Sequence, residues 1–114
     1  MSNNETAIES EIQTKGLNAP RLSPQMIDDT IMSEHYVRAS DVMLTAATCT
    51  SEEALSCLTL CVLVLKNGFT IVGKSACASP ANFDMELGRK IAREDARRQI
   101  WALEGYNLRS KLAA

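Results

Sequence analysis

The dipeptide Asn67-Gly68 constrains this chain more than any other feature of its sequence. It lies between two runs rich in apolar and β-branched residues, 58–66 and 69–74. Asn-Gly between two such runs is the strongest short-range signal for a β-hairpin, because both residues tolerate positive φ. We therefore expect an antiparallel hairpin over about residues 57–76.

A two-residue turn would fix which side chains share a face of that hairpin. It pairs Lys66 with Phe69 and Val64 with Ile71. One face would then carry Val62, Val64, Phe69 and Ile71, and the other would carry Cys61, Leu63, Leu65 and Val72. Both faces are apolar, so both should be covered. A long helix could cover one, and the N-terminal segments or another subunit could cover the other.

A long helix is predicted over about residues 82–104, after a Ser79-Pro80 loop. Asn82 would cap it, and Gly105 would end it. Mostly small side chains recur at helical spacing along one stripe, which consists of Met85, Gly88, Ala92, Ala96, Ile100 and Leu103. Such a stripe suits close packing on a sheet. A second apolar strip consists of Leu87, Ile91 and Ala102. One core cannot easily bury both strips, which favours an oligomer, although a loop folded over the second strip would also serve.

The segments before the hairpin predict short helices and a strand. A weak helix over 5–15, which Gly16 ends, is followed by a linker over 17–22. A helix then runs from Ser23 to about Met32, and a half-exposed strand covers 33–39. Residues 40–50 form either a helix or a loop. Together these elements indicate one α+β domain over residues 1–114, in which a small antiparallel sheet packs against the long helix and residues 1–22 form an arm and linker.

Composition argues against several classes of function. The net charge is −2, whereas nucleic-acid binders usually show a net basic balance. No apolar run approaches the ~18 residues of a membrane span, and the first residues carry no apolar signal core, so we expect a cytosolic protein. The four cysteines, Cys49, Cys57, Cys61 and Cys77, lie among apolar or small residues without metal-site spacing. We expect them to be reduced and buried.

Three arginines, Arg89, Arg93 and Arg97, recur at every fourth position of the predicted helix. They have two interpretations. They could form a solvated helix face, with Glu86 and Glu94 as ion-pair partners. They could instead form an anion site, because the planar guanidinium binds phosphate through two parallel hydrogen bonds.

Three further residues would complete such an anion site. Ser79 and Asn82 precede the helix, where backbone N–H groups commonly bind phosphate. Phe69 follows the hairpin turn and could stack on a base, or could simply cover the hairpin end. The sequence shows no nucleotide-binding glycine motif, paired catalytic carboxylates or Ser/His/Asp set, so we expect no catalysis, no metal and no cofactor.

Motifs spread over most of the chain resemble one family. They are Asn67-Gly68-Phe69, Ser75-Ala76-Cys77, Pro80, Asn82-Phe83-Asp84, Gly88-Arg89-Lys90-Ile91-Ala92-Arg93, Trp101, Leu103 and Gly105-Tyr106, together with the upstream Ala19-Pro20-Arg21 and Ser33-Glu34-His35-Tyr36. This pattern resembles the small tailed-phage proteins usually labelled gene product 49-like. The part of the chain that matches least is 40–56.

The resemblance implies kinship to phage Thoeris anti-defence proteins of the first type. Those proteins bind the ADP-ribose-derived cyclic signal made by bacterial TIR enzymes and sequester it without cleavage. Related proteins bind cyclic oligonucleotides of CBASS immunity, and they assemble as dimers or hexamers. By this resemblance the chain would be a homo-oligomeric, non-enzymatic binder of a cyclic nucleotide in the host bacterial cytoplasm.

Chemistry, rather than the resemblance, selects the candidate ligand-binding residues. They are Phe69, Ser79, Asn82, Arg89, Arg93 and Arg97. Two other functions remain open. The chain could be a phage accessory protein that inhibits a host protein through the second apolar strip, or a nucleic-acid binder that uses the arginines.

Overall fold

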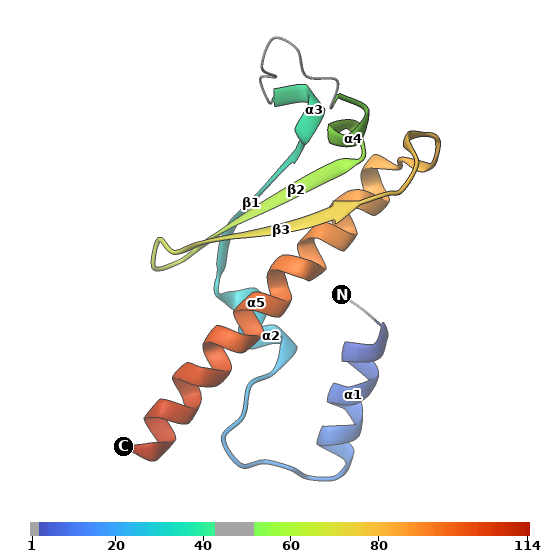
Figure 1. Cartoon of the computed structure of the whole chain (residues 1–114). Coiled ribbons are helices and arrows are strands. Elements are labelled where there is room, and N and C mark those ends of the chain that lie inside the picture. The colour runs from blue at the N-terminus through green and yellow to red at the C-terminus, as the bar shows by residue number, and fades with distance from the viewer. Residues whose placement is uncertain (1–2, 43–51) are drawn as a thin grey trace.

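The computed structural model describes residues 3–42 and 52–114 (Figure 1). Its elements are α1 (Asn3–Thr14), α2 (Pro24–Asp29), β1 (Ile31–Arg38), α3 (Ala39–Val42), α4 (Glu52–Ser56), β2 (Leu58–Leu65), β3 (Thr70–Ala76), a 3₁₀ turn η1 (Pro80–Asn82) and α5 (Met85–Ala113). The strands form an antiparallel sheet in the order β1-β2-β3, and α5 lies across one face. The predicted α+β fold is confirmed. Of the open segment 40–50, residues 40–42 belong to α3, and the rest lies outside the described residues.

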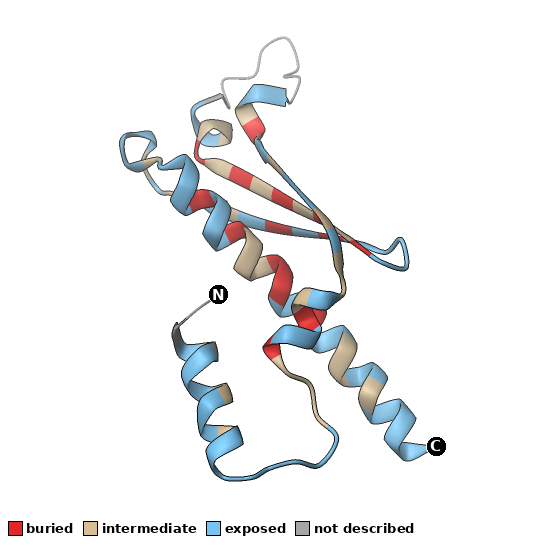
Figure 2. Ribbon diagram, turned by 180° about the vertical axis from the view of Figure 1, so that it is seen from behind, coloured by how far each residue is buried: buried red, intermediate tan, exposed pale blue. Residues whose placement is uncertain are grey.

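Small residues let α5 approach the sheet closely, as predicted from the stripe. Ala92 and Ala96 are fully buried against β3. A methyl group added at Gly73 of β3 would collide with the carbonyl oxygen of Ala92 and the backbone nitrogen of Ala96. The remaining core is formed by Ile27, Cys61, Leu63, Leu65, Ile71 and Ile100. Figure 2 shows most of these buried positions in α5 and in the strands that it crosses, while Ile27 belongs to α2.

The turn between β2 and β3 is one residue longer than predicted. The Leu65 N–H donates to the Phe69 carbonyl oxygen at 2.8 Å, and the Gly68 N–H donates to the Leu65 carbonyl oxygen at 2.9 Å. Lys66, Asn67 and Gly68 therefore form the loop, with Gly68 at a φ of +88°. Asn-Gly also suits this three-residue loop, in which glycine takes the left-handed position. The predicted pairing of Lys66 with Phe69 is wrong.

The additional loop residue exchanges the two faces of β3. Leu63 pairs with Ile71, and Val62 pairs with Val72. Ile71 therefore lies beneath α5 beside Cys61 and Leu63, whereas Val72 lies on the opposite face and is 53% exposed. A shift of one residue reverses every side chain of a strand, which is why the predicted faces of β3 are wrong.

The long helix begins later and ends later than predicted. Asp84 caps it in place of Asn82, and the Asp84 carboxylate accepts a hydrogen bond from the Leu87 N–H at 2.8 Å. The helix continues through Gly105 to Ala113. A glycine inside a helix costs only about 1 kcal/mol, and the residues after it include no proline, so the helix can continue.

The N-terminal arm lies beside α5 (Figure 1). Gly16, with a φ of +66°, follows the end of α1 as predicted. The Ser23 hydroxyl caps α2, accepting from the Met26 N–H at 3.3 Å. The helix α2 ends at Asp29 rather than Met32, and β1 begins at Ile31.

The face of the sheet opposite α5 is apolar, and no other described helix lies across it (Figure 1). Its centre is formed by Leu60, Val62 and Val64, which are half-buried. On the flanking strands, Val37 is 36% exposed and Val72 is 53% exposed. The cover of this face by another subunit therefore stays a prediction.

Candidate functional site

Arg97 lies at the centre of a buried charge cluster. Its guanidinium is 1% exposed and donates to the Glu5 carboxylate at 2.9 and 3.0 Å and to Asp28 at 3.0 Å. The hydrogen bond from Arg97 lowers the pKa of Glu5 below its usual value, although burial opposes this shift. Protein carboxylates thus engage this guanidinium, and they join α1 and α2 to α5.

Arg93, one turn nearer the start of α5, is also engaged by carboxylates. Its Nε donates to Glu34 at 2.9 Å, and its Nη2 lies 3.6 Å from Asp28. Glu34 also accepts a hydrogen bond from the Tyr36 hydroxyl at 2.9 Å. Arg89, by contrast, is exposed and forms no ion pair with any residue that the structure describes.

Arg89 and a second arginine, Arg38 of β1, each lie over an aromatic ring near the N-terminal end of α5. The Cζ atom of Arg89 is 5.7 Å from the centre of the Tyr36 ring, and that of Arg38 is 3.8 Å from the centre of the Phe83 ring. Both distances allow cation–π attraction. The Arg38 Nε donates to the Ser56 carbonyl oxygen at 2.7 Å, while its Nη groups have no hydrogen-bond partner among the described residues. We call Tyr36, Arg38, Phe83 and Arg89 the arginine–aromatic cluster.

The arginine–aromatic cluster lines a small cavity that adjoins an open groove. The cavity has a volume of about 160 Å³, and Asp41 brings one carboxylate to its wall. The groove, of about 480 Å³, shares Tyr36 and Arg89 with the cavity and extends to Lys90 and Arg93. The cavity is smaller than the roughly 300–1,000 Å³ of typical ligand pockets, so a nucleotide could be enclosed only if another surface covered the groove.

Thr59 of β2 brings an unpaired hydroxyl to the same cavity. The residue is 3% exposed, and its Oγ1 has no hydrogen-bond partner among the described residues. An unsatisfied buried hydroxyl costs about 1–3 kcal/mol. Thr59 also lines a neighbouring pocket of about 210 Å³ that shares Phe83 with the cavity. Because Oγ1 itself is covered, beneath Gly88 of α5, a polar ligand group would reach it only after the Thr59 side chain rotates.

The structure places Asn82 near the arginine–aromatic cluster and Phe69 far from it. Asn82 lines the neighbouring pocket, but its backbone N–H donates to the Ser79 carbonyl oxygen at 3.0 Å. The carboxylate of Asp84 caps the start of α5, so this helix end already carries a negative group. Phe69 is 55% exposed and directly precedes β3, whereas η1 follows the other end of that strand. The ligand contacts of Ser79, Asn82 and Phe69 stay predictions.

Sequence reasoning missed Tyr36, Arg38, Thr59 and Phe83. Tyr36 and Phe83 lie within motifs that carried the family resemblance, and this was the available signal. The alternation of β1 also places Tyr36 and Arg38 on one face. Only the fold shows that this face turns toward α5, because Tyr36 pairs with the buried Cys61.

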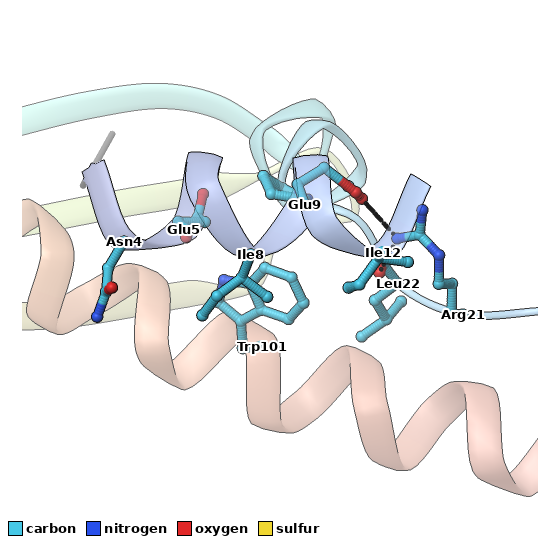
Figure 3. Close-up of a pocket in the computed structure, with 9 residues that line it drawn as sticks. Asn4, Glu5, Ile8, Glu9, Ile12, Arg21, Leu22 and Trp101 are labelled. Carbon is cyan, nitrogen blue, oxygen red and sulfur yellow. Dashed lines mark hydrogen bonds and ion pairs between the residues drawn. The ribbon is translucent and has the colours of Figure 1, made fainter. Parts of the chain in front are cut away.

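A separate apolar cleft lies between α1 and α5 (Figure 3). It has a volume of about 390 Å³, and its apolar walls are Ile8, Ile12, Leu22, Pro24 and Trp101. Its charged lining residues are already paired, since Arg21 lies 2.6 Å from Glu9 and Glu5 binds Arg97. The cleft thus offers apolar surface, and none of the described residues that line it is a free cation for an anionic ligand.

Residues 3–42 and 52–114 offer neither a metal cluster nor a membrane-spanning helix. This part of the chain contains no group of three or more His, Cys, Asp or Glu side chains placed to hold a metal ion. None of its helices is long and apolar enough to cross a membrane.

Comparison with known proteins identifies a family for most of the chain. Residues 22–112 match the family described as phage protein (N4 Gp49/phage Sf6 gene 66). No curated protein and no solved structure matches the chain significantly. The matched range contains the sheet, α5 except its last residue, and the arginine–aromatic cluster, but not α1. The kinship to Thoeris anti-defence proteins stays a prediction, whereas the chain belongs to the phage N4 Gp49/phage Sf6 gene 66 protein family.

Proposed function

We propose that this protein binds a cyclic nucleotide signal of bacterial immunity in the host cytoplasm and sequesters it without degrading it. The proposed ligand is an ADP-ribose-derived cyclic nucleotide, with cyclic di- and trinucleotides as related ligands. The observation that carries the proposal is the arginine–aromatic cluster. It presents two guanidinium groups without carboxylate partners among the described residues, each beside a ring, around the unpaired Thr59 hydroxyl.

Each part of such a ligand matches a group at this site. The pyrophosphate would accept charge-assisted hydrogen bonds from Arg38 and Arg89. A purine base would stack on Tyr36 or Phe83, and stacking contributes about 1–3 kcal/mol per base. A ribose hydroxyl or base edge would pair with Thr59. Nanomolar binding corresponds to roughly −12 kcal/mol. Because association itself is costly, these contacts would reach that value only if a second subunit enclosed the ligand and added contacts of its own.

Enclosure of the ligand requires a second subunit, so we also propose a homo-oligomer such as a dimer or hexamer. Leu87 and Ile91 expose 55% and 46% of their surface on α5 near the site, and the outer face of the sheet is apolar as well. Phe69 is separated from Arg89 by the length of β3, about 20 Å at the usual rise per residue. Its predicted ligand contact therefore requires a neighbouring chain.

The exposed strip at Leu87 and Ile91 also favours one alternative function. An apolar strip beside a charged groove is a common feature of protein-binding surfaces. The protein could thus inhibit a host protein through this strip. A nucleic-acid binder is less favoured, because Arg93 and Arg97 are engaged by Glu34, Glu5 and Asp28.

Thermal-shift screening against cyclic ADP-ribose isomers and cyclic di- and trinucleotides tests the proposal. A ligand at a thousandfold excess over its Kd stabilises the folded state by about 4 kcal/mol, which corresponds to a rise in Tm of at least ~10 °C. The ligand should be recovered intact after the protein is denatured by heat. Recovery of a hydrolysed product would indicate an enzyme. If no nucleotide raises the Tm, the proposed ligand class is wrong.

A further inference from the structure

Cys57 and Cys77 lie directly opposite each other just beyond the ends of β2 and β3. Leu58 pairs with Ala76 in the ladder, so the next position outward pairs the two cysteines. The Cys77 N–H donates to the Cys57 carbonyl oxygen at 3.2 Å. The antiparallel pairing therefore continues for one position beyond the strands.

This position suits a disulfide. Hydrogen-bonded residues in an antiparallel ladder have Cα atoms about 5.5 Å apart, within the roughly 4.4–6.8 Å that a disulfide spans. Both side chains line the same pocket of about 210 Å³, and the Cys77 sulfur lies 3.8 Å from the Cys57 carbonyl oxygen. Burial and then the hydrogen bond with the Cys77 thiol raise the pKa of Cys57. The two thiols are therefore neighbours.

The pair differs from the third cysteine that the structure describes. Cys77 is half-buried, and Cys57 is 7% exposed at the wall of the pocket. Cys61 is fully buried, and the residue opposite it on β3 is Gly73. A small oxidant can therefore reach Cys77 first, whereas Cys61 has no thiol across the ladder.

We propose that Cys57 and Cys77 form a reversible intramolecular disulfide. The Cys77 thiolate attacks one sulfur of a small-molecule disulfide, such as oxidised glutathione, and releases one thiolate of that molecule. The Cys57 thiolate then attacks the Cys77 sulfur of the mixed disulfide and releases the second thiolate. Both cysteines are thereby oxidised, and the small disulfide is reduced to two thiols that take up the two protons given up by the cysteines.

The disulfide would connect two segments that hold Arg38. The Ser56 carbonyl oxygen, which accepts the Arg38 hydrogen bond, immediately precedes Cys57. The Phe83 ring, on which Arg38 stacks, lies on the segment that follows Cys77. Oxidation would thus fix one wall of the cavity. This modification does not depend on the proposed ligand, since its formation is read chemically without any nucleotide.

Thiol counting on the full chain tests the disulfide. The Cys49→Ser background is used because Cys49 lies outside the described residues and could compete. After incubation with oxidised glutathione, we expect chains that migrate singly under denaturing, non-reducing conditions and that have each lost two free thiols and two hydrogen atoms of mass. Dithiothreitol should restore both thiols. The oxidised form should melt about 10 °C above the reduced form, because the bond closes a loop in the unfolded chain.

Single substitutions in this background assign the bond. Cys77→Ser and Cys57→Ser should each abolish the loss of two thiols, while Cys61→Ala should retain it. Cys77→Ser is the decisive variant, because a half-buried position tolerates serine without loss of the fold. A disulfide that persists in Cys77→Ser, a disulfide lost in Cys61→Ala, or a stable mixed disulfide with glutathione in place of the internal bond would each overturn the proposal.

Discussion

Arg89 and Arg97 are the same residue type on one helix, about two turns apart, yet their surroundings are opposite. Arg97 is 1% exposed and is held by Glu5 and Asp28. Arg89 is exposed and lies over the Tyr36 ring. The difference comes from elements distant in sequence, because α1 and α2 bring their carboxylates to Arg97 but not to Arg89. We infer that the Arg97 end of α5 serves stability and the Arg89 end serves binding.

The largest expected effect is a difference in stability between variants of Arg97 and of Arg89. Arg97→Met should lower the free energy of unfolding by about 3 kcal/mol, because Glu5 and Asp28 would lose their partner in a largely buried site. Arg89→Met should change it by less than about 0.5 kcal/mol, as is usual for exposed positions. Urea denaturation of both variants measures the difference. Equal losses would show that the Arg89 end is also structural.

The next prediction compares the cost of adding a methyl group at two glycines. Gly73 packs against Ala92 and Ala96 of α5, and Gly88 lies near the Arg89 end of that helix. Gly73→Ala should cost about 2–3 kcal/mol, because the methyl group would collide with the backbone of α5 at Ala92 and Ala96. At Gly88 the nearest atom to an added methyl would be the Thr59 Oγ1 at 2.8 Å, part of a side chain that can rotate. Gly88→Ala should therefore change stability by less than about 1 kcal/mol, since helix propensity improves. Thermal denaturation of the two variants measures both losses of stability. A larger loss in Gly88→Ala than in Gly73→Ala would contradict the prediction.

A smaller effect concerns the pH dependence of the Arg97 end. The hydrogen bond from Arg97 lowers the pKa of Glu5 from its usual 4.5. A carboxyl group whose pKa is lower in the folded state stabilises the fold above its unfolded pKa, and this stabilisation is lost as the pH falls through the folded pKa. Urea midpoints of Glu5→Gln should therefore depend less on pH below 4.5 than those of the wild type. Glu11→Gln, on an exposed position of α1, is the matched control, and identical profiles for Glu5→Gln and wild type would contradict the assignment.

The smallest effect on stability concerns the uncovered face of the sheet. Val72→Lys should change the free energy of unfolding by less than about 0.5 kcal/mol, because Val72 is 53% exposed. If this face joins subunits, however, the added charge should dissociate the oligomer in sedimentation experiments. Lys74→Ala, on the same face of β3, serves as the control. If the wild-type protein sediments as a monomer, the proposed homo-oligomer is wrong.

The fold could be predicted from sequence wherever one local signal determined one structure. Ser23 and Gly16 identified their helix ends, and the small-residue stripe identified the packing face of α5. Asn67-Gly68 identified the hairpin but not its loop length, because the same dipeptide suits both a two-residue and a three-residue loop. The end of α5 was misplaced because a helical glycine costs too little to end a helix whose following residues favour it.

The candidate site was less predictable, because it depends on contacts between distant segments. The spacing of Arg89, Arg93 and Arg97 predicted a shared helix face, but only the fold determines which arginine meets a carboxylate. Glu5 is 92 residues from Arg97, and no local pattern connects them. Tyr36 and Arg38 were visible as one face of a strand, but their position beside Arg89 required the β1–β2 pairing.

The central claim is that a nucleotide binds at the Arg89 end of α5, and the dissociation constants of matched arginine variants test it most directly. For the cyclic nucleotide that raises the Tm most, titration calorimetry should show Arg89→Ala and Arg38→Ala each weakening binding by about 10–100-fold, the usual loss for a charge-assisted hydrogen bond. Arg109→Ala, at an exposed position near the far end of the same helix, should bind within about twofold of the wild type. Wild-type affinity in both Arg89→Ala and Arg38→Ala would contradict the account.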